Sequence, residues 1–311
     1  MNKRYKIFTW PIHQQYLFQL AQGDFDIYIP SGQNESFRKQ FSAQKNVIET
    51  DFEAIKEVLL DCILFQDEQS YTTAQFEVLS DQQRRLPKIY LEHHPPKQHP
   101  TNAKHVVEDL DVQLIHVNHY NALMWDNNQV PVTVIENGVA TETASFTGEK
   151  PSGVVVLEES PADNRVTGYD VFLQVKEVLP MDIIQIGKDN ITYQNLPENL
   201  SQYRFLFCAD RYQSLPFTVY EALIIGMPVV GLATTDLSTI INNEISGFAD
   251  SDLSYLILKM QYLLADPQAA VQIGSEARKL ALPRFSLNRF LADWKQVIEN
   301  AVAKKPLLIK Y

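Results

Sequence analysis

The chain has 311 residues, which is more than one typical domain, so two domains of about 150 residues each are expected. Its apolar share of 45% and charged share of 21% are those of an ordinary globular protein and exclude a disordered or fibrous chain. The net charge of −11 forms no acidic tail and excludes a protein that gathers nucleic acid by bulk attraction.

The amino terminus is basic, but its apolar stretch is too short for a signal peptide and is interrupted at Pro11 and His13. No window approaches the roughly 18 consecutive apolar residues that span a bilayer. Cys62 and Cys208 both lie in apolar runs, which indicates buried thiols in a reducing compartment and no disulfide or zinc site. We therefore expect a cytoplasmic protein with at most peripheral membrane contact.

Short β-rich runs alternate with helical patterns along the first half of the chain. This alternation is typical of parallel sheets covered by helices. The expected strands are residues 5–9, 25–29, 46–48, 62–65, 88–91, 112–117 and 132–135. The sequence thus predicts one α/β domain over residues 1–145.

The strand and helix pattern starts again after a segment rich in Thr, Ser and Gly, residues 142–152, which has the composition of a linker. This restart predicts a second Rossmann-like domain over residues 146–285. Its expected strands are residues 153–157, 181–186, 204–208, 228–232 and 247–248.

Beyond Ser251 the pattern is helical, with helices predicted over residues 253–264, 268–281 and 286–303 and an interruption at Pro283. The last helix carries five apolar residues at amphipathic spacing. It needs a surface to pack on, and we expect residues 286–311 to cross back to the first domain. The apolar residues are Phe290, Leu291, Trp294, Val297 and Ile298.

Residues 209–231 hold the most informative motif of the chain. They are expected to form a loop, a helix from Thr218, a stop at Gly226 and, after Pro228, a strand. The amino end of that helix would face the carboxyl edge of the sheet, where open α/β sheets bind ligands and where backbone N–H groups suit a phosphate.

This motif resembles the donor-binding segment of family 4 retaining glycosyltransferases, which have the GT-B fold: two Rossmann-like domains facing across a cleft, with a C-terminal helix returning to the first. The family pattern has two glutamates eight positions apart, then Ala, a Gly-x-Pro turn and a Val-Val strand. Glu221 matches the second glutamate, whereas Gln213 replaces the first. Residues 233–248, the helical tail 266–286 and the Asn-Gly-Val turn at 137–139 are also similar to the family.

The resemblance implies that Glu221 binds the ribose hydroxyls of a nucleotide and that Gln213 still lines the donor pocket. It also implies that a loop offers backbone N–H groups to the diphosphate and sugar; this loop is Ser214, Leu215, Pro216, Phe217 and Thr218. A structural alternative is a capping box, in which Thr218 and Glu221 only close the start of the helix.

Histidines and prolines follow the strand at residues 88–91 and form a rigid loop at its carboxyl end. By the resemblance, His93 approaches the donor sugar, with the adjacent His94 as the alternative. A zinc cluster of His93, His99, His116 and His119 is disfavoured, because no helical His-x-x-x-His pair with carboxylate support is present.

Two further regions are candidates for contact with the donor or acceptor. His13 and Gln14 follow the first strand where family members carry a glycine-rich turn, and a plain βα turn is the alternative reading. Arg165 and Arg211 are candidates to neutralise the diphosphate, since Asp170 stands where the family has a lysine. Both arginines could instead form surface salt bridges.

The expected function is glycosyl transfer with retention, from a nucleoside-diphosphate sugar to a cell-surface glycan or lipid-linked precursor. By the resemblance, it needs neither metal nor other cofactor, and the leaving phosphate itself takes the acceptor's proton. The protein's part would be positioning and electrostatic stabilisation of the departing diphosphate. The alternatives are a non-catalytic nucleotide-sugar or glycan-binding protein on the same scaffold, and a nucleotide-sugar epimerase.

Overall fold

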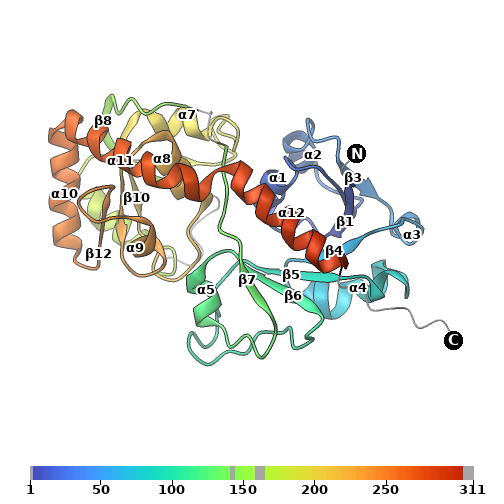
Figure 1. Cartoon of the computed structure of the whole chain (residues 1–311). Coiled ribbons are helices and arrows are strands. Elements are labelled where there is room, and N and C mark those ends of the chain that lie inside the picture. The colour runs from blue at the N-terminus through green and yellow to red at the C-terminus, as the bar shows by residue number, and fades with distance from the viewer. Residues whose placement is uncertain (1–2, 141–143, 158–164, 304–311) are drawn as a thin grey trace. The chain divides into compact units, whose positions relative to one another are not determined.

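The computed structural model describes residues 3–140, 144–157 and 165–303 (Figure 1). The predicted linker residues Glu142 and Thr143 and the last residues of the predicted C-terminal segment, 304–311, lie outside this range. The chain divides into two compact units. The first takes in the chain up to Glu136 and again from Phe290, and the second is Asn137–Arg289.

The first unit is built on a parallel sheet of seven strands with the order β3-β2-β1-β4-β5-β6-β7. Each predicted strand of the first half is present, with ends that differ from the predicted ones by at most two residues. Strands β2 and β3 follow β1 on one side of the sheet, and β5, β6 and β7 follow β4 on the other side. The strand order therefore reverses between the neighbours β1 and β4. The strands are β1 (Tyr5–Thr9), β2 (Phe25–Pro30), β3 (Val47–Thr50), β4 (Cys62–Phe65), β5 (Lys88–Glu92), β6 (Val112–His116) and β7 (Val132–Val134).

Short helices connect most of these strands, as is usual for parallel neighbours, whereas β5 and β6 are joined by a segment without a helix. Ile7, Ile63 and Leu114 are less than 2% exposed, because both faces of the sheet are covered. The connecting helices are α1 (Gln14–Leu20), α2 (Glu35–Gln40), α3 (Phe52–Ile55), α4 (Gln75–Val78) and α5 (His119–Met124), with single turns at Ser70–Ala74 and Gln83–Arg85.

The C-terminal helix α12 (Leu287–Ala303) packs on the first unit beside α1, as the sequence predicts (Figure 1). The indole Nε1 of Trp294 donates to the hydroxyl of Tyr16 at 2.8 Å, and the ring of Phe290 lies 5.3 Å from that of Tyr16. Four of the five predicted apolar positions are buried; Leu291 is partly exposed.

The second unit contains a parallel sheet of five strands with the order β12-β11-β10-β8-β9. All five predicted strands are present, but the first begins earlier than predicted, at Lys150, inside the predicted linker. The strands are β8 (Lys150–Leu157), β9 (Met181–Gln185), β10 (Tyr203–Cys208), β11 (Val229–Leu232) and β12 (Phe248–Asp250). The helices are α6 (Tyr169–Lys176), α7 (Leu196–Ser201), α8 (Phe217–Ile225), α9 (Leu237–Ile240), α10 (Leu253–Ala265) and α11 (Pro267–Phe285).

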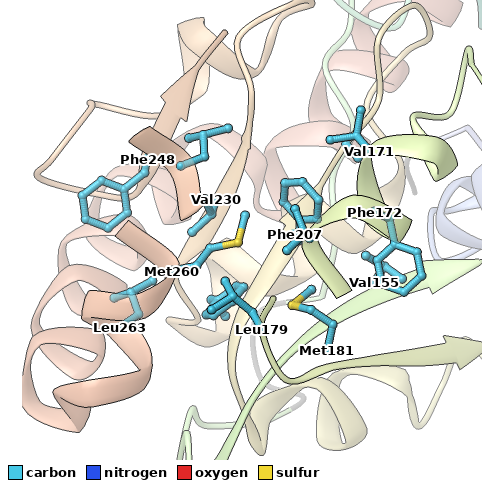
Figure 2. Close-up of a cluster of buried hydrophobic side chains, with 14 of the residues drawn as sticks. Val155, Val171, Phe172, Leu179, Met181, Phe207, Val230, Phe248, Met260 and Leu263 are labelled. Carbon is cyan, nitrogen blue, oxygen red and sulfur yellow. The ribbon is translucent and has the colours of Figure 1, made fainter. Parts of the chain in front are cut away.

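The core of the second unit fills the space between one face of this sheet and its helices. Phe172 from α6, Phe207 from β10 and Met260 from α10 meet there, together with Val230 from β11 (Figure 2). Burying large apolar side chains contributes about 1.5–3 kcal/mol each. This core holds the strand ends of the second unit in fixed positions.

The predicted break at Pro283 is wrong, because α11 continues through this proline to Phe285. Pro283 lies in the last turn, where its ring costs the helix only one backbone hydrogen bond near the end. Ala281 and Phe285 on either side of it are 2% and 1% exposed, and Phe285 packs on Tyr220 with the ring centres 4.8 Å apart. The break falls instead at the extended Ser286.

The unit boundary also differs from the predicted one between residues 145 and 146. The backbone N–H of Val139 donates to Phe285 at 2.9 Å, and that of Leu287 donates to Val139 at 3.0 Å. These bonds tie residues 137–140 to the end of α11, so that segment belongs to the second unit.

Gly274 of α11 lies directly against the end of α8. A Cβ at this position would stand 1.8 Å from the carbonyl oxygen of Gly226, the left-handed cap of α8. Because that oxygen belongs to the backbone, a helix would have to move. We expect Gly274→Ala to lower the free energy of unfolding by about 2 kcal/mol, measured by urea denaturation. Ser275→Ala, at an exposed position one residue on, is the control and should leave stability unchanged.

Candidate functional site

Three histidines gather at the carboxyl edge of the first unit's sheet, where the strand order reverses. His13 follows β1, and His93 and His94 follow β5. The ring centre of His13 lies 3.7 Å from that of His93 and 5.2 Å from that of His94. His93 is 7% exposed, and the ring of Tyr16 packs edge-on against it at 5.0 Å. We call His13, His93 and His94 the histidine cluster.

A hydrogen-bond chain determines which nitrogen of His93 carries the proton. The side-chain nitrogen of Gln66, the residue after β4, donates at 3.0 Å to the carbonyl oxygen of Trp10, an atom that can only accept. The Gln66 oxygen therefore faces the Nε2 of His93 at 3.1 Å and accepts a hydrogen bond from the N–H at that position. His93 consequently holds its proton on Nε2, and its Nδ1 is the acceptor of the ring.

The histidine cluster is uncharged at neutral pH. Burial lowers the pKa of His13 to about 4, with a further decrease from His94. Burial also lowers the pKa of His93 well below its ordinary value, and the neighbouring His13 lowers it further. The pKa of His94 is lowered by burial as well. A neutral imidazole can donate a hydrogen bond to a sugar hydroxyl or accept one from it, and it does not attract a counter-ion.

Glu92, whose side chain is only 14% exposed, supports the loop that carries these histidines. Burial raises its pKa, but hydrogen bonds from His105 and from the backbone N–H of His94 outweigh burial and leave the pKa below its ordinary value. The two bonds measure 3.2 and 2.9 Å. Glu92 is therefore ionised at neutral pH and holds the start of the loop in place.

The lowered pKa of His13 predicts a loss of stability in mild acid. The unfolded chain takes up a proton near pH 6.5, whereas the folded chain does so only near pH 4. The free energy of unfolding therefore falls as the pH falls through this window and levels off below it. His13 alone should remove about 1 kcal/mol by about pH 5.5.

Urea unfolding of the wild type and of His13→Gln, at about pH 7.5 and about pH 5.5, measures this loss. The variant should lose less stability between the two conditions than the wild type. His119→Gln, at an exposed histidine of the same unit, is the control and should behave as the wild type. An equal loss in His13→Gln and the wild type would show that His13 is not buried in its neutral form.

In the second unit, the strand order reverses between β8 and β10, and the predicted donor-binding residues follow these strands. Asp210, the second residue of the loop after β10, is 8% exposed. Its carboxylate accepts from the side-chain nitrogen of Gln213 and, at 3.2 Å, from the thiol of Cys208. Thr234, just after β11, donates to the carbonyl oxygen of Asp210 at 2.7 Å. These bonds fix the loop between β10 and α8.

Helix α8 begins at Phe217 and is capped by Pro216, with no side-chain hydrogen bond at the cap. Thr218 is thus the second helical residue, and the capping-box alternative for Thr218 and Glu221 is wrong. Every residue of α8 is buried, and Glu221, 6% exposed, is its only charged residue. A carboxylate costs free energy on such a helix, so its presence points to a function beyond helix stability.

In the predicted phosphate-binding loop, the side chains of Leu215 and Phe217 are buried, so the backbone is the main group that the loop offers to a ligand. Leu215 is 2% exposed and Phe217 9%, so their side chains anchor the loop in the core. Pro216 has no N–H and cannot donate to a phosphate. The N–H groups of Phe217 and Thr218 belong to the first turn of α8, at the amino end of the helix. Ser214 is partly exposed beside them.

The two predicted phosphate-binding arginines both contact Asp170. Arg211 makes a two-pronged ion pair with it, with Nη1 to Oδ1 at 2.6 Å and Nη2 to Oδ2 at 2.9 Å. Arg165 is exposed, and its Nη1 lies 3.4 Å from Oδ2. The salt-bridge alternative for both arginines is therefore present in the structure.

Several residues of these two regions escape sequence reasoning. Gln66, which orients His93, and Glu92, which supports the loop, are single polar residues at the ends of buried strands. Asp210 and Thr234 follow strands in the same way. A polar residue at the end of a buried parallel strand, or within two residues after it, is the signal that could have identified all four. Gln14 is partly exposed at the start of α1, next to His13.

The described residues also bear on two other classes of site. Within this part of the chain, no group of three or more His, Cys, Asp or Glu side chains is arranged to hold a metal ion. Likewise, none of the described helices has the length and apolar character needed to cross a membrane.

The two sheets, their strand orders and the returning helix define the GT-B fold of glycosyltransferases, and comparison with solved structures confirms it. The chain is similar to HepE from Anabaena in complex with UDP and glucose, with a TM-score of 0.72 and 12% identity over 95% of this chain and 100% of that chain. It is similar to sucrose-phosphate synthase from Thermosynechococcus elongatus, with a TM-score of 0.70 and 13% identity over 96% and 100%.

A third similar structure is that of TarM from S. aureus in complex with fondaparinux, α-GlcNAc-glycerol and UDP. Its TM-score is 0.59 and its identity 15%, over 79% of this chain and 58% of that chain. No protein-family model and no curated protein matches the sequence. At these identities the similarity establishes the fold.

Proposed function

We propose that the chain is a glycosyltransferase that moves a sugar from a nucleoside-diphosphate donor to a sugar or lipid-linked acceptor. The observation that carries this proposal is Glu221, a buried carboxylate on the otherwise apolar helix α8 that does not cap the helix. It stands in the helix that follows β10, beside the point where the strand order reverses, which is where α/β sheets bind nucleotides.

We further propose that the nucleotide is UDP. The HepE structures contain UDP, UDP-glucose, or UDP with glucose, and the TarM structure contains UDP with α-GlcNAc-glycerol. In this chain, Glu221 would accept hydrogen bonds from the ribose hydroxyls. The first N–H groups of α8, those of Phe217 and Thr218, would donate to phosphate oxygens.

The proposed reaction breaks the bond between the anomeric carbon and the donor's phosphate oxygen and forms a bond to an acceptor hydroxyl on the same face of the sugar. The departing phosphate takes the hydroxyl proton, so no protein base, metal or other cofactor is required. His93, neutral and protonated on Nε2, is proposed to contact the donor sugar. Gln213 is proposed to line the donor pocket, with its amide oriented by Asp210.

A panel of nucleotide sugars with the wild-type protein tests this function. Release of the nucleoside diphosphate from at least one donor, raised by a sugar acceptor, is the expected result. NMR of the product should show the donor's anomeric configuration. Binding of a nucleotide sugar without turnover would favour a binding protein, which the pairing of Arg211 with Asp170 makes the second candidate. A changed sugar on an intact donor would favour an epimerase.

A further inference from the structure

Arg211, a candidate to bind the diphosphate of the proposed donor, is already paired with a carboxylate of the chain itself, that of Asp170. The planar guanidinium of Arg211 presents two N–H groups side by side, and both donate to the two oxygens of Asp170, at 2.6 and 2.9 Å. This contact holds the pKa of Asp170 below its ordinary value, so the carboxylate is ionised at neutral pH. Phosphate oxygens engage the same two-pronged arrangement.

The local backbone brings these two residues together. Gly168, which precedes α6, has a φ of +69°, and a Cβ there would lie 1.8 Å from the carbonyl oxygen of Ala209. The backbone N–H of Arg211 donates to Val166 at 2.8 Å. The start of α6 therefore lies directly on the segment after β10, and Asp170 in the first turn of α6 meets Arg211.

A second arginine, Arg165, also contacts the Asp170–Arg211 pair. Arg165 lies 3.4 Å from the same carboxylate, and Nη1 of Arg211 donates to the carbonyl oxygen of Arg165 at 2.9 Å. Two positive charges thus share one negative charge, and the net charge of the three side chains is +1. A diphosphate would have to displace Asp170 from Arg211 to gain a two-pronged contact, and it would then lie beside a carboxylate.

We propose that Asp170 is an internal competitor for the donor's diphosphate and that donor binding breaks the Asp170–Arg211 pair. This inference rests on the proposed function. Asp170 thereby determines donor affinity: it keeps Arg211 occupied until a diphosphate with enough other contacts, such as those to Glu221 and α8, replaces it. Its effect should grow with the number of phosphate charges on the ligand and vanish for a ligand without phosphate.

Calorimetric titrations of the wild type and Asp170→Asn with UDP, uridine and pyrophosphate test the proposal. Removing the competing charge should tighten binding of UDP and pyrophosphate about tenfold and leave the affinity for uridine unchanged. Arg211→Ala in the Asp170→Asn background should remove the gain. Asp170→Glu, which keeps a carboxylate, should remain close to the wild type.

Asp182→Asn is the matched control. Asp182 forms an ion pair with Lys150 at 2.6 Å in the same unit, so its replacement by Asn makes the same change in net charge. Asp182 lies near the starts of β8 and β9, whereas the proposed donor-binding residues follow the ends of the strands. It should not change the affinity for any of the three ligands. Melting temperatures of all variants show whether each protein is folded.

The outcomes separate this inference from the proposed function. Unchanged or weaker UDP and pyrophosphate binding in folded Asp170→Asn would overturn the competition, as would an equal gain for uridine. A different outcome is that Asp170→Asn binds pyrophosphate more tightly than the wild type does, binds UDP no more tightly than pyrophosphate, and does not bind uridine. This outcome would retain the competition and overturn the nucleotide function. No binding of any ligand to any folded variant would overturn both.

Discussion

Glu221→Gln is expected to weaken UDP binding by about 10- to 100-fold while leaving the melting temperature unchanged or higher. The amide has the size of the carboxylate but cannot form charge-assisted hydrogen bonds with two ribose hydroxyls. The folded protein gains from the change, because a neutral group costs less than a charge on the buried helix α8. Titration calorimetry with UDP and a thermal melt measure the two quantities.

Glu244→Gln is the control for this experiment. Glu244 is an exposed glutamate of the same unit, 2.9 Å from Lys259 and 2.8 Å from the hydroxyl of Tyr255. Its replacement should leave UDP affinity as it is. If Glu221→Gln keeps the wild-type affinity and instead melts at lower temperature, Glu221 has a structural role and the ribose contact is wrong.

The fold could be predicted from the sequence because its signal is local. Each strand is a short apolar run between turn residues, and a parallel sheet follows from the alternation with helices. The errors occurred where a contact distant in sequence decides. Pro283 stays helical because Phe285 packs on Tyr220, and residues 137–140 join the second unit because Val139 pairs with the end of α11.

The candidate site was predictable only in part, for the same reason. The residues after the strands could be placed at one edge of each sheet, and His13 and His93 were each predicted to contact the donor or acceptor; that their rings meet is seen only in the structure. Which side chains pair could not be predicted: the Gln66 bond that sets the tautomer of His93 spans 27 residues, and the Arg211 bond to Asp170 spans 41. The sequence made Arg165 and Arg211 candidates for the phosphate, with surface salt bridges as the alternative, but did not identify Asp170 as the partner of both.

The largest effect on catalysis is expected from His93→Phe. Phenylalanine keeps a ring against His13 and Tyr16 but can neither donate to Gln66 nor accept from a sugar hydroxyl. If His93 contacts the sugar at the reacting centre, kcat should fall about 100-fold. The affinity for UDP should change less than about twofold, because the proposed contact is to the sugar and not to the nucleotide.

His116→Phe is the matched control, because His116 is also a buried histidine at the end of a strand whose Nε2 bonds to an amide oxygen, that of Asn127 at 2.7 Å. It lies outside the histidine cluster. Its replacement should lower the melting temperature and leave kcat of the folded protein unchanged. Comparing the two variants separates loss of a buried polar contact from loss of a catalytic one. Wild-type turnover in His93→Phe would exclude His93 and make His94, 5.2 Å from His13, the next residue to replace.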